Sequence, residues 1–427
     1  MFSIKSQWTA LMAGLALAVS PIMAGEAGPL LDALVRKGIL SDQEAEDLRA
    51  DLSRESQEFV MASVSAGKST NSVALNGRLQ LQYAGLNSDQ NVAGTNQLFM
   101  RRIYFGMNAG IGPDWTANFL YDFAGGGFDK AFVEWSGYLG SEAIALDFGL
   151  RKVNFGYEET TSSGSLKAIE RSPVTRFFVE PNNGRRLGAG SYRVGVFADG
   201  GSVDVRKGKS TGLFYGAALT TQTRIDGFGD ASADGIKYSG SGTNGSLNSL
   251  AMWANVGYSK VLSPASKFVV GAAYGLLPDM GGASNTNFGK GHDITEYSLY
   301  FDYTAGAFNL SGEYLSATVD GALAGGTKAA KPSGYWIQPS FAVSEKLELV
   351  ARYSEVDADG RNIRASDGIR SAPAARTGQQ LEEFYLGLNY YLINQDVKLQ
   401  LGYINGKLSD GGSEKVDGLR SQLQVNF

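Results

Sequence analysis

The sequence contains no cysteine, one histidine and only ten prolines among its 427 residues. The lack of cysteine excludes disulfide bonds, thiolate metal sites and cysteine nucleophiles. A serine–histidine–acid site would have to use the single histidine, His292, which lies in the glycine-rich segment 278–294. No nucleophile-elbow motif accompanies it. The sequence therefore argues against a hydrolase, and we expect no cofactor and no metal site.

Long apolar runs are also missing. The apolar stretch Trp8–Val19, at about 12 residues, is too short to span a bilayer comfortably. Lys5 precedes it, and the small residues of 20–24 follow it, which predicts a secretory signal peptide over residues 1–24. Beyond that segment no run of about 18 apolar residues occurs, so helical spanning is excluded. Only a closed β-barrel could then place the chain in a membrane, because every backbone group must find a strand partner.

The segment 25–70 is predicted to be a helical periplasmic segment with a linker. Within residues 28–57, Ala45, Leu48 and Leu52 follow a helical spacing, and Ser41 and Glu44 have the spacing of a capping box. About 30 residues cannot bury a core alone. The segment therefore either binds a partner, such as another copy of the chain or a periplasmic component, or is a solvated spacer.

From residue 71 onward the spacing of apolar residues changes to a period of two. Leu79, Leu81 and Tyr83, for example, alternate with Gln80 and Gln82. Segments of roughly ten residues with one apolar and one polar face are typical of transmembrane β-barrels. Sixteen such segments are predicted, over 73–84, 98–110, 115–124, 130–138, 143–151, 187–197, 212–223, 250–261, 267–277, 295–304, 308–319, 334–343, 347–357, 382–393, 397–407 and 419–427.

The connections between these segments alternate in length. Those after odd-numbered strands are long, such as 152–186 and 408–418, and those after even-numbered strands are short, as in outer-membrane barrels. Two connections depart from the rule, since 125–129 is short and 198–211 is long. We predict an all-β fold, a 16-stranded antiparallel transmembrane β-barrel over 71–427. The two exceptions leave open a count that differs by two strands, and a soluble antiparallel sheet is the alternative.

Strict alternation assigns the charged residues of the strands to the lumen, because a charge facing lipid at mid-depth costs roughly 2–4 kcal/mol. The candidate lumen residues that bind or pass anions are Arg78, Arg102, Asp122, Lys130 and Arg151. Arg101 has the opposite parity, and we expect it at a strand end, beside a polar loop or the lipid headgroups.

The connection 152–186 is the longest and the richest in charge. A barrel of about 16 strands leaves an aqueous channel, which a loop folded inward would narrow. Lys152 and Arg171 belong to this candidate constriction loop. Rings of arginine and lysine select anions, and arginine binds phosphate oxygens with two hydrogen bonds. A solvated external loop of mixed charge is the alternative.

Several motifs make a family resemblance visible. The chain resembles the phosphate-selective porin O/P family of Gram-negative outer membranes in Phe99–Arg102 (FMRR), Asn118–Ala124 (NFLYDFA), Phe148–Lys152 (FGLRK), Phe155–Glu159 (FGYEE), Ile169–Ser172 (IERS) and Arg185–Gly188 (RRLG). The resemblance implies a homotrimer of 16-stranded barrels in which arginines and lysines draw phosphate to a constriction. Arg102, Asp122 and Lys152 are the positions most nearly carried over.

Two departures from the family pattern leave the solute open. Lys152 is followed by Val153 and Asn154, whereas the family often has proline two residues after that lysine. Loss of Lys5 with the signal peptide would change the formal charge from −5 to −6, which gives no general attraction for anions. We therefore expect a porin among outer-membrane lipids that passes small solutes, with phosphate-like anions as one reading and general diffusion as another. A structural tether through residues 28–57 is a third, and no nucleic-acid partner is expected.

Overall fold

The computed structural model describes residues 69–427, apart from 141, 182, 184, 222–230, 233–234, 237–249, 279–292 and 324–327. The predicted signal peptide, the predicted helices of 28–57 and His292 lie outside the described residues. The chain divides into two compact units, Met1–Ala74 and Leu75–Phe427. The second unit holds almost all of the sheet.

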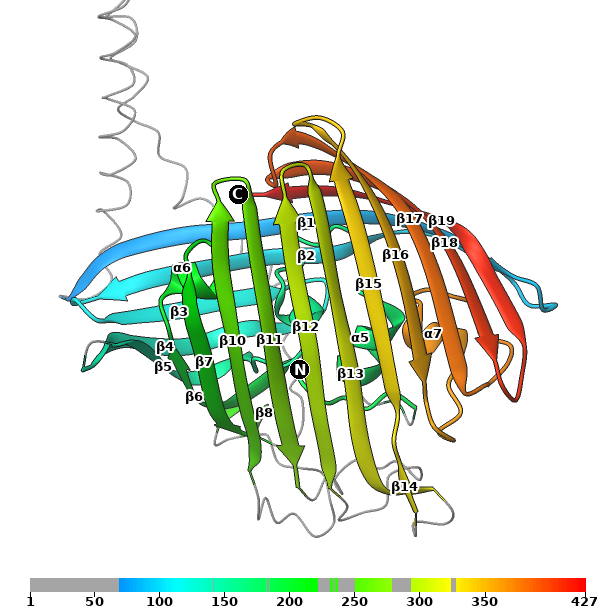
Figure 1. The fold of residues 1–427 in the computed structure, drawn as a ribbon, viewed down its shortest axis with the longest axis horizontal. Helices are drawn as coiled ribbons and strands as arrows, with labels where there is room; N and C mark the ends of the chain where they lie inside the picture. Colours follow the sequence, from blue (N-terminus) through cyan, green and yellow to red (C-terminus); the bar gives the residue numbers. More distant parts are fainter. Residues whose placement is uncertain are drawn as a thin grey trace, which may run out of the picture. The chain divides into compact units, whose positions relative to one another are not determined.

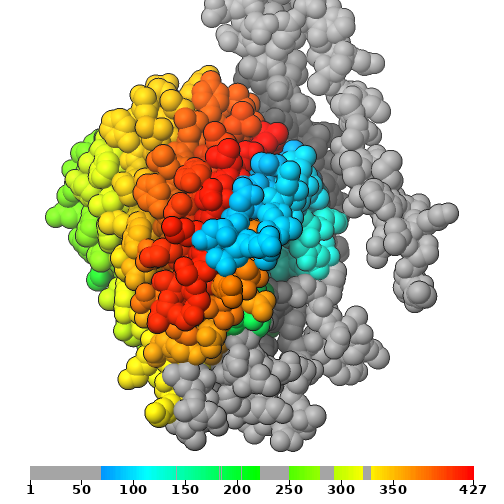
Figure 2. All heavy atoms as spheres, turned by 90° about the vertical axis from the view of Figure 1, so that its right-hand side faces the viewer, coloured from blue at the N-terminus to red at the C-terminus, as the bar shows by residue number. Residues whose placement is uncertain are grey.

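One antiparallel sheet closes on itself to form a barrel (Figure 1). β1 pairs with both β2 and β19, and Figure 2 shows β1 beside β19 on the surface. The three-residue strand β14 (Lys328–Ala330) pairs with the end of β13 just before β15, so it adds no strand to the wall. The sixteen wall strands are β1 (Thr70–Ser88), β2 (Thr95–Ile111), β3 (Trp115–Asp122), β4 (Gly127–Leu139), β5 (Glu142–Lys152), β6 (Tyr192–Gly200), β7 (Gly212–Thr220), β10 (Ala251–Ser263), β11 (Ser266–Leu277), β12 (Ile294–Ala305), β13 (Phe308–Leu323), β15 (Ser333–Ala342), β16 (Leu347–Asp357), β17 (Gln380–Ile393), β18 (Val397–Ser409) and β19 (Glu414–Asn426). A separate pair, β8 (Ala231–Ser232) and β9 (Gly235–Ile236), belongs to the connection between β7 and β10.

The predicted 16-stranded barrel is confirmed, and each predicted span overlaps one wall strand. The sixth strand begins at Tyr192 rather than at 187, because the backbone N–H groups of Leu187 and Ala189 donate to carbonyls of Phe177 and Phe178 inside the barrel. The last strand begins at Glu414, so the connection 410–413 is short where a long one was predicted. Both predicted exceptions occur: 123–126 is short, and 201–211 is long and contains α6 (Val203–Arg206).

The polarity of the two faces of the wall is the reverse of that in a soluble protein. On β1, Leu79, Leu81 and Tyr83 are 37–38% exposed, whereas Gln80 and Gln82 are fully buried. Large apolar side chains are exposed in the same way on all sides of the sheet. An apolar outer face and a polar inner face suit a wall that has lipid outside and polar groups inside.

Residues 153–191, here called the inner segment, fold into the barrel between β5 and β6. The inner segment contains α4 (Tyr157–Thr160) and α5 (Pro173–Val179). Ser172 caps α5, since its hydroxyl accepts a hydrogen bond from the Thr175 N–H, and proline follows at the first helical position. Figure 1 shows α5 and α7 (Ala365–Gly368) within the ring of strands. No helix in the described part of the chain is long and apolar enough to cross a membrane.

Apolar packing holds the inner segment in place. Phe155, Phe177 and Phe178 are fully buried and belong to one cluster with the wall residues Trp253 and Leu315. Burying an aromatic or aliphatic side chain contributes roughly 1.5–3 kcal/mol, so this cluster stabilises the inward position strongly.

Candidate functional site

Polar side chains of the wall bind the backbone of the inner segment. Gln424 Nε2 donates to the Gly164 carbonyl at 3.0 Å, and Asn389 Nδ2 donates to the Lys167 carbonyl at 3.0 Å. Lys398 Nζ donates to the Leu166 carbonyl, also at 3.0 Å. These donors are fully buried and come from β17, β18 and β19. The lumen beside these three strands is therefore filled, and its polar face satisfies carbonyl groups rather than water.

Two buried charged residues hold α4 against the opposite wall. The Glu313 carboxylate accepts hydrogen bonds from the backbone N–H groups of Tyr157 and Glu158, at 2.7 and 3.1 Å. Arg352 pairs with Glu158 at 3.0 Å and with Glu383 at 2.7 Å. Arg352 on β16 thus joins the inner segment to β17 through one guanidinium group.

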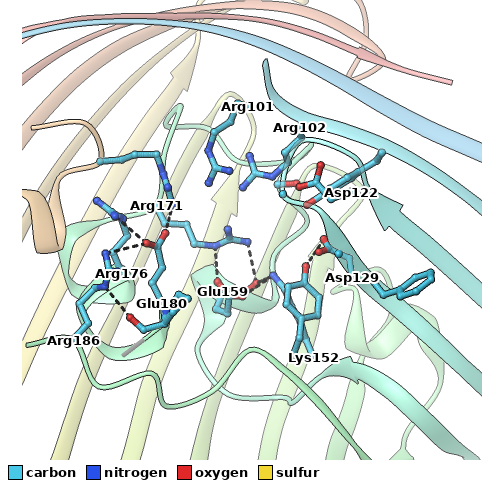
Figure 3. A pocket seen from close by; sticks show the side chains of 18 residues that line it. Arg101, Arg102, Asp122, Asp129, Lys152, Glu159, Arg171, Arg176, Glu180 and Arg186 are labelled. Carbon is cyan, nitrogen blue, oxygen red and sulfur yellow. Dashed lines mark hydrogen bonds and ion pairs between the residues drawn. The ribbon is translucent and has the colours of Figure 1, made fainter. Parts of the chain in front are cut away.

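A cavity of about 390 Å³ lies between the inner segment and strands β2–β6. Its described lining contains seven basic and four acidic residues, so positive charge is in excess. Figure 3 shows Arg101 and Arg102, from β2, facing the arginines of the inner segment. The charged lining residues are Arg101, Arg102, Asp122, Asp129, Lys152, Glu159, Arg171, Arg176, Glu180, Arg186 and Arg370, and Tyr104, Phe128 and Tyr192 add aromatic surface.

The Glu159 carboxylate lies between two cations of the cavity. Lys152 Nζ is 2.8 Å from Glu159 Oε1, and Arg171 Nε is 2.9 Å from Glu159 Oε2. Arg171 also donates to backbone carbonyls of the inner segment, including those of Glu158 and Thr161. Arg171 therefore fixes the turn after α4 and presents its charge to the cavity at the same time.

Glu170 is likewise shared by two arginines. Arg101 Nε lies 2.7 Å from Glu170 Oε1, and Arg370 Nε lies 3.0 Å from Glu170 Oε2. Burial raises the pKa of the Glu170 carboxyl, but the nearby Arg101, Arg370 and Arg102 guanidinium groups outweigh burial and hold this pKa well below its usual range. Glu170 is therefore ionised and neutralised by its partners.

Glu180 is the third shared carboxylate and joins two connections. It pairs with Arg176 at 2.8 Å, with Arg186 at 3.5 Å and with Arg370, which comes from the connection between β16 and β17. Burial raises the pKa of Glu180, and the charges of these arginines lower it well below its usual range. With the carboxylates neutralised, the excess basic groups determine the sign of the potential in the cavity.

Four of the seven candidates predicted in the lumen or the constriction loop, Arg102, Asp122, Lys152 and Arg171, line the cavity. Asp122 serves the backbone, since its carboxylate accepts hydrogen bonds from the N–H groups of Ile103 and Ala124 at 3.1 and 3.0 Å. These two hydrogen bonds give Asp122 a structural role among the basic residues. The parts of these four residues in solute binding stay predictions.

The other three predicted residues are not among the described lining residues. Arg78 donates to Ser163 at 2.6 Å and to Asn426 at 2.7 Å, which ties β1 to the inner segment. Arg151 pairs with Asp147 and, at 2.8 Å, with Asp199. Lys130 stands opposite Leu120 in the register of β3 and β4. A role for these three in anion binding also stays a prediction.

Sequence reasoning did not single out several charged residues of the cavity, among them Asp129, Arg176 and Arg370, and it placed Arg101 only loosely. Arg370 lies in the long connection before β17, and its only signal in the sequence is the basic run Arg361, Arg364, Arg370 and Arg376. Arg101 lies inside β2 rather than at the expected strand end, and it faces the polar inner segment and lines the cavity beside Arg102.

A closed membrane barrel of sixteen strands, with an inward-folded segment beside a charged cavity, is the architecture of a porin. The chain is a porin of the bacterial outer membrane. The family model "Phosphate-selective porin O and P" matches residues 73–427, and the chain belongs to this family, as its motifs indicated.

Among curated proteins, the chain is 21% identical to Porin O of Pseudomonas aeruginosa over 410 residues, which cover 83% of this chain and 88% of that protein. Among solved structures, it is similar to the anion-selective porin from Comamonas acidovorans, with a TM-score of 0.55 and 16% identity over 83% of this chain and 99% of that one. The outer membrane channel DcaP of Acinetobacter baumannii has a TM-score of 0.53 and 12% identity, covering 84% and 99% of the two chains. These structures share the fold.

Proposed function

We propose that this porin passes small anions in preference to cations, and that phosphate-like anions are among its solutes. The excess of basic groups in the cavity carries the proposal, because seven basic residues face four acidic ones in a chain whose formal net charge is −5. Basic side chains gathered at the narrow part of a channel select anions, even when the rest of the protein carries a net negative charge.

Arginine chemistry supports the phosphate part of the proposal. Six of the seven basic lining residues are arginines, whose planar guanidinium groups match the oxygen atoms of a phosphate in pairs. The descriptions of the matched family and of the Comamonas acidovorans porin name phosphate and anion selectivity for those proteins, which agrees with this proposal. A general diffusion porin is the competing function.

The reversal potential of the purified protein in a planar bilayer under a potassium chloride gradient tests the proposal. We expect a permeability ratio in favour of chloride, and we expect Arg102→Gln to lower that ratio about twofold or more, because Arg102 lines the cavity. Lys346→Gln is the matched control, since it removes a charge in the exposed turn between β15 and β16. A reversal potential near zero, or one that favours potassium, would overturn anion selectivity.

We also propose that three copies of the chain form a homotrimer, as membership of the family suggests. The molar mass of the detergent-solubilised protein, measured by light scattering, distinguishes three chains from one. Tethering through residues 28–57 falls outside the described residues and stays a prediction.

A further inference from the structure

Two buried arginines of the lumen make no ion pair with any carboxylate of the described chain. Arg102 on β2 is 5% exposed, and Arg420 on β19 is 1% exposed. All other basic residues of the described cavity lining pair with Glu159, Glu170 or Glu180. The carboxylates of Glu170 and Asp129 interact with Arg102 only from beyond the 4.0 Å of an ion pair.

Neutral amides hold these two guanidinium groups instead. Arg102 Nη1 donates to Gln80 Oε1 at 2.7 Å, and Arg420 Nη1 donates to Gln82 Oε1, also at 2.7 Å. Both glutamines are fully buried and lie two residues apart on the inner face of β1. Amides on β19 help to orient them, because their Nε2 groups donate to Gln424 and Gln422 at 2.7 and 3.2 Å. Gln82 Nε2 also donates to Glu170 Oε1 at 3.1 Å.

An amide and a carboxylate at this position would have opposite effects on the channel. The amide oxygen satisfies one guanidinium donor and fixes the orientation of the arginine, but it carries no net charge. A carboxylate of the same shape would form a charge-assisted pair and cancel the charge. A buried guanidinium without a counter-ion is energetically costly. An anion that enters the cavity beside Arg102 supplies the direct ion-pair partner that Arg102 lacks in the described chain.

We infer that Gln80 and Gln82 are positioning residues that determine selectivity: they hold Arg102 and Arg420 in the lumen without neutralising them. Gln80 has the larger effect on selectivity, because Arg102 lines the cavity. Arg420 is not among the described lining residues and lies beside Glu170 and Arg370. This inference rests on the proposed anion selectivity and assigns it to β1 as well as to the inner segment.

Two substitutions of Gln80 separate charge from shape. Gln80→Glu keeps the shape and adds a carboxylate next to Arg102, and we expect it to lower the chloride-over-potassium permeability ratio about threefold or more. Gln80→Met removes the amide but adds no charge. Because Arg102 then loses its orientation but keeps its charge, we expect the ratio to fall, but by less than about twofold. A purely structural role for Gln80 would change the ratio equally in both variants.

Gln338→Glu is the control for a carboxylate placed elsewhere in the lumen. Gln338 is buried on the inner face of β15, and no arginine of the described chain is hydrogen-bonded to it. We expect this variant to change the ratio less than Gln80→Glu does. The inference would be overturned if Gln80→Glu kept the wild-type permeability ratio. It would also be overturned if Gln338→Glu or Gln80→Met lowered the ratio as much as Gln80→Glu does. Neither result would affect the anion selectivity of the wild type. A wild-type barrel without anion preference would overturn the proposed function itself.

Discussion

Replacing Arg352 with glutamine should lower the free energy of unfolding by about 3–5 kcal/mol, because it leaves buried carboxylates without their counter-ion. Arg352 is 2% exposed and pairs with both Glu158 and Glu383. It also donates to the Glu170 carbonyl at 2.9 Å, so the same change loosens the inner segment. We therefore also expect a larger and noisier single-channel conductance. Thermal unfolding in detergent and bilayer recordings measure the two effects.

An exposed ion pair on the neighbouring strands provides the control. Lys407 on β18 lies 3.9 Å from Glu382, and its side chain is 48% exposed. Such a pair contributes about 0–1 kcal/mol, so Lys407→Gln should leave both unfolding and conductance nearly unchanged. Equal behaviour of the two variants would show that Arg352 does not anchor the inner segment.

Replacing Arg370 with glutamate should remove most of the anion preference. This residue lines the cavity and bridges Glu170 and Glu180. Reversing its charge changes the described lining from seven basic and four acidic residues to six and five. It also places a third carboxylate beside two existing ones, which like-charge repulsion opposes. We expect the chloride-over-potassium permeability ratio to fall about fivefold or more, as measured from the reversal potential.

Arg376→Glu is the matched control in the same connection. Arg376 is exposed and donates to Gln90 at 3.3 Å, and it is not among the described lining residues of the cavity. This variant should keep its ratio within about twofold of the wild-type value. A similar loss of anion preference in both variants would mean that the charge of the whole connection between β16 and β17, rather than that of the cavity, determines selectivity.

The wall was predictable from the sequence because lipid and lumen impose opposite polarity on successive residues. Leu79 and Leu81 face outward and Gln80 and Gln82 face inward, as the alternation predicted. The alternation repeats in every strand, so an error at the end of one strand does not change the predicted number of strands. Strand ends were less predictable, because the backbone N–H groups of Leu187 and Ala189 donate to carbonyls of the inner segment rather than to a neighbouring strand.

The cavity was only partly predictable. Alternation identifies the face of a strand residue but not its height in the barrel or the side on which the inner segment packs. Arg102 and Lys152 line the cavity, whereas Lys130 and Arg151 are not among its described lining residues. Asp122 was predicted in the lumen, but its hydrogen bonds to backbone N–H groups could not be read from a spacing.

Arg101 and Arg370 show two further limits of sequence reasoning. Pairing of β2 with β3 begins at Tyr104, so no β3 partner enforces strict alternation at Arg101. Arg370 meets Glu180 across 190 residues of sequence, in a contact between two connections of irregular structure. Neither contact follows from a period of two.

Chemical modification of single thiols tests most directly whether the solute passes through the cavity and whether the charge there is positive. Because the chain has no cysteine, Ser163→Cys and Ser340→Cys each introduce a single thiol. Ser163 lines the cavity, whereas Ser340 on β15 is buried and bonded to Lys167 of the inner segment. Anionic and cationic thiol reagents of equal size are compared by the rate at which each reduces the channel current. We predict that a thiol at 163 reacts faster with the anionic reagent and that a thiol at 340 stays unmodified. Equal or faster reaction of the 163 thiol with the cationic reagent, or ready modification at 340, would contradict a solute path through a positively charged cavity.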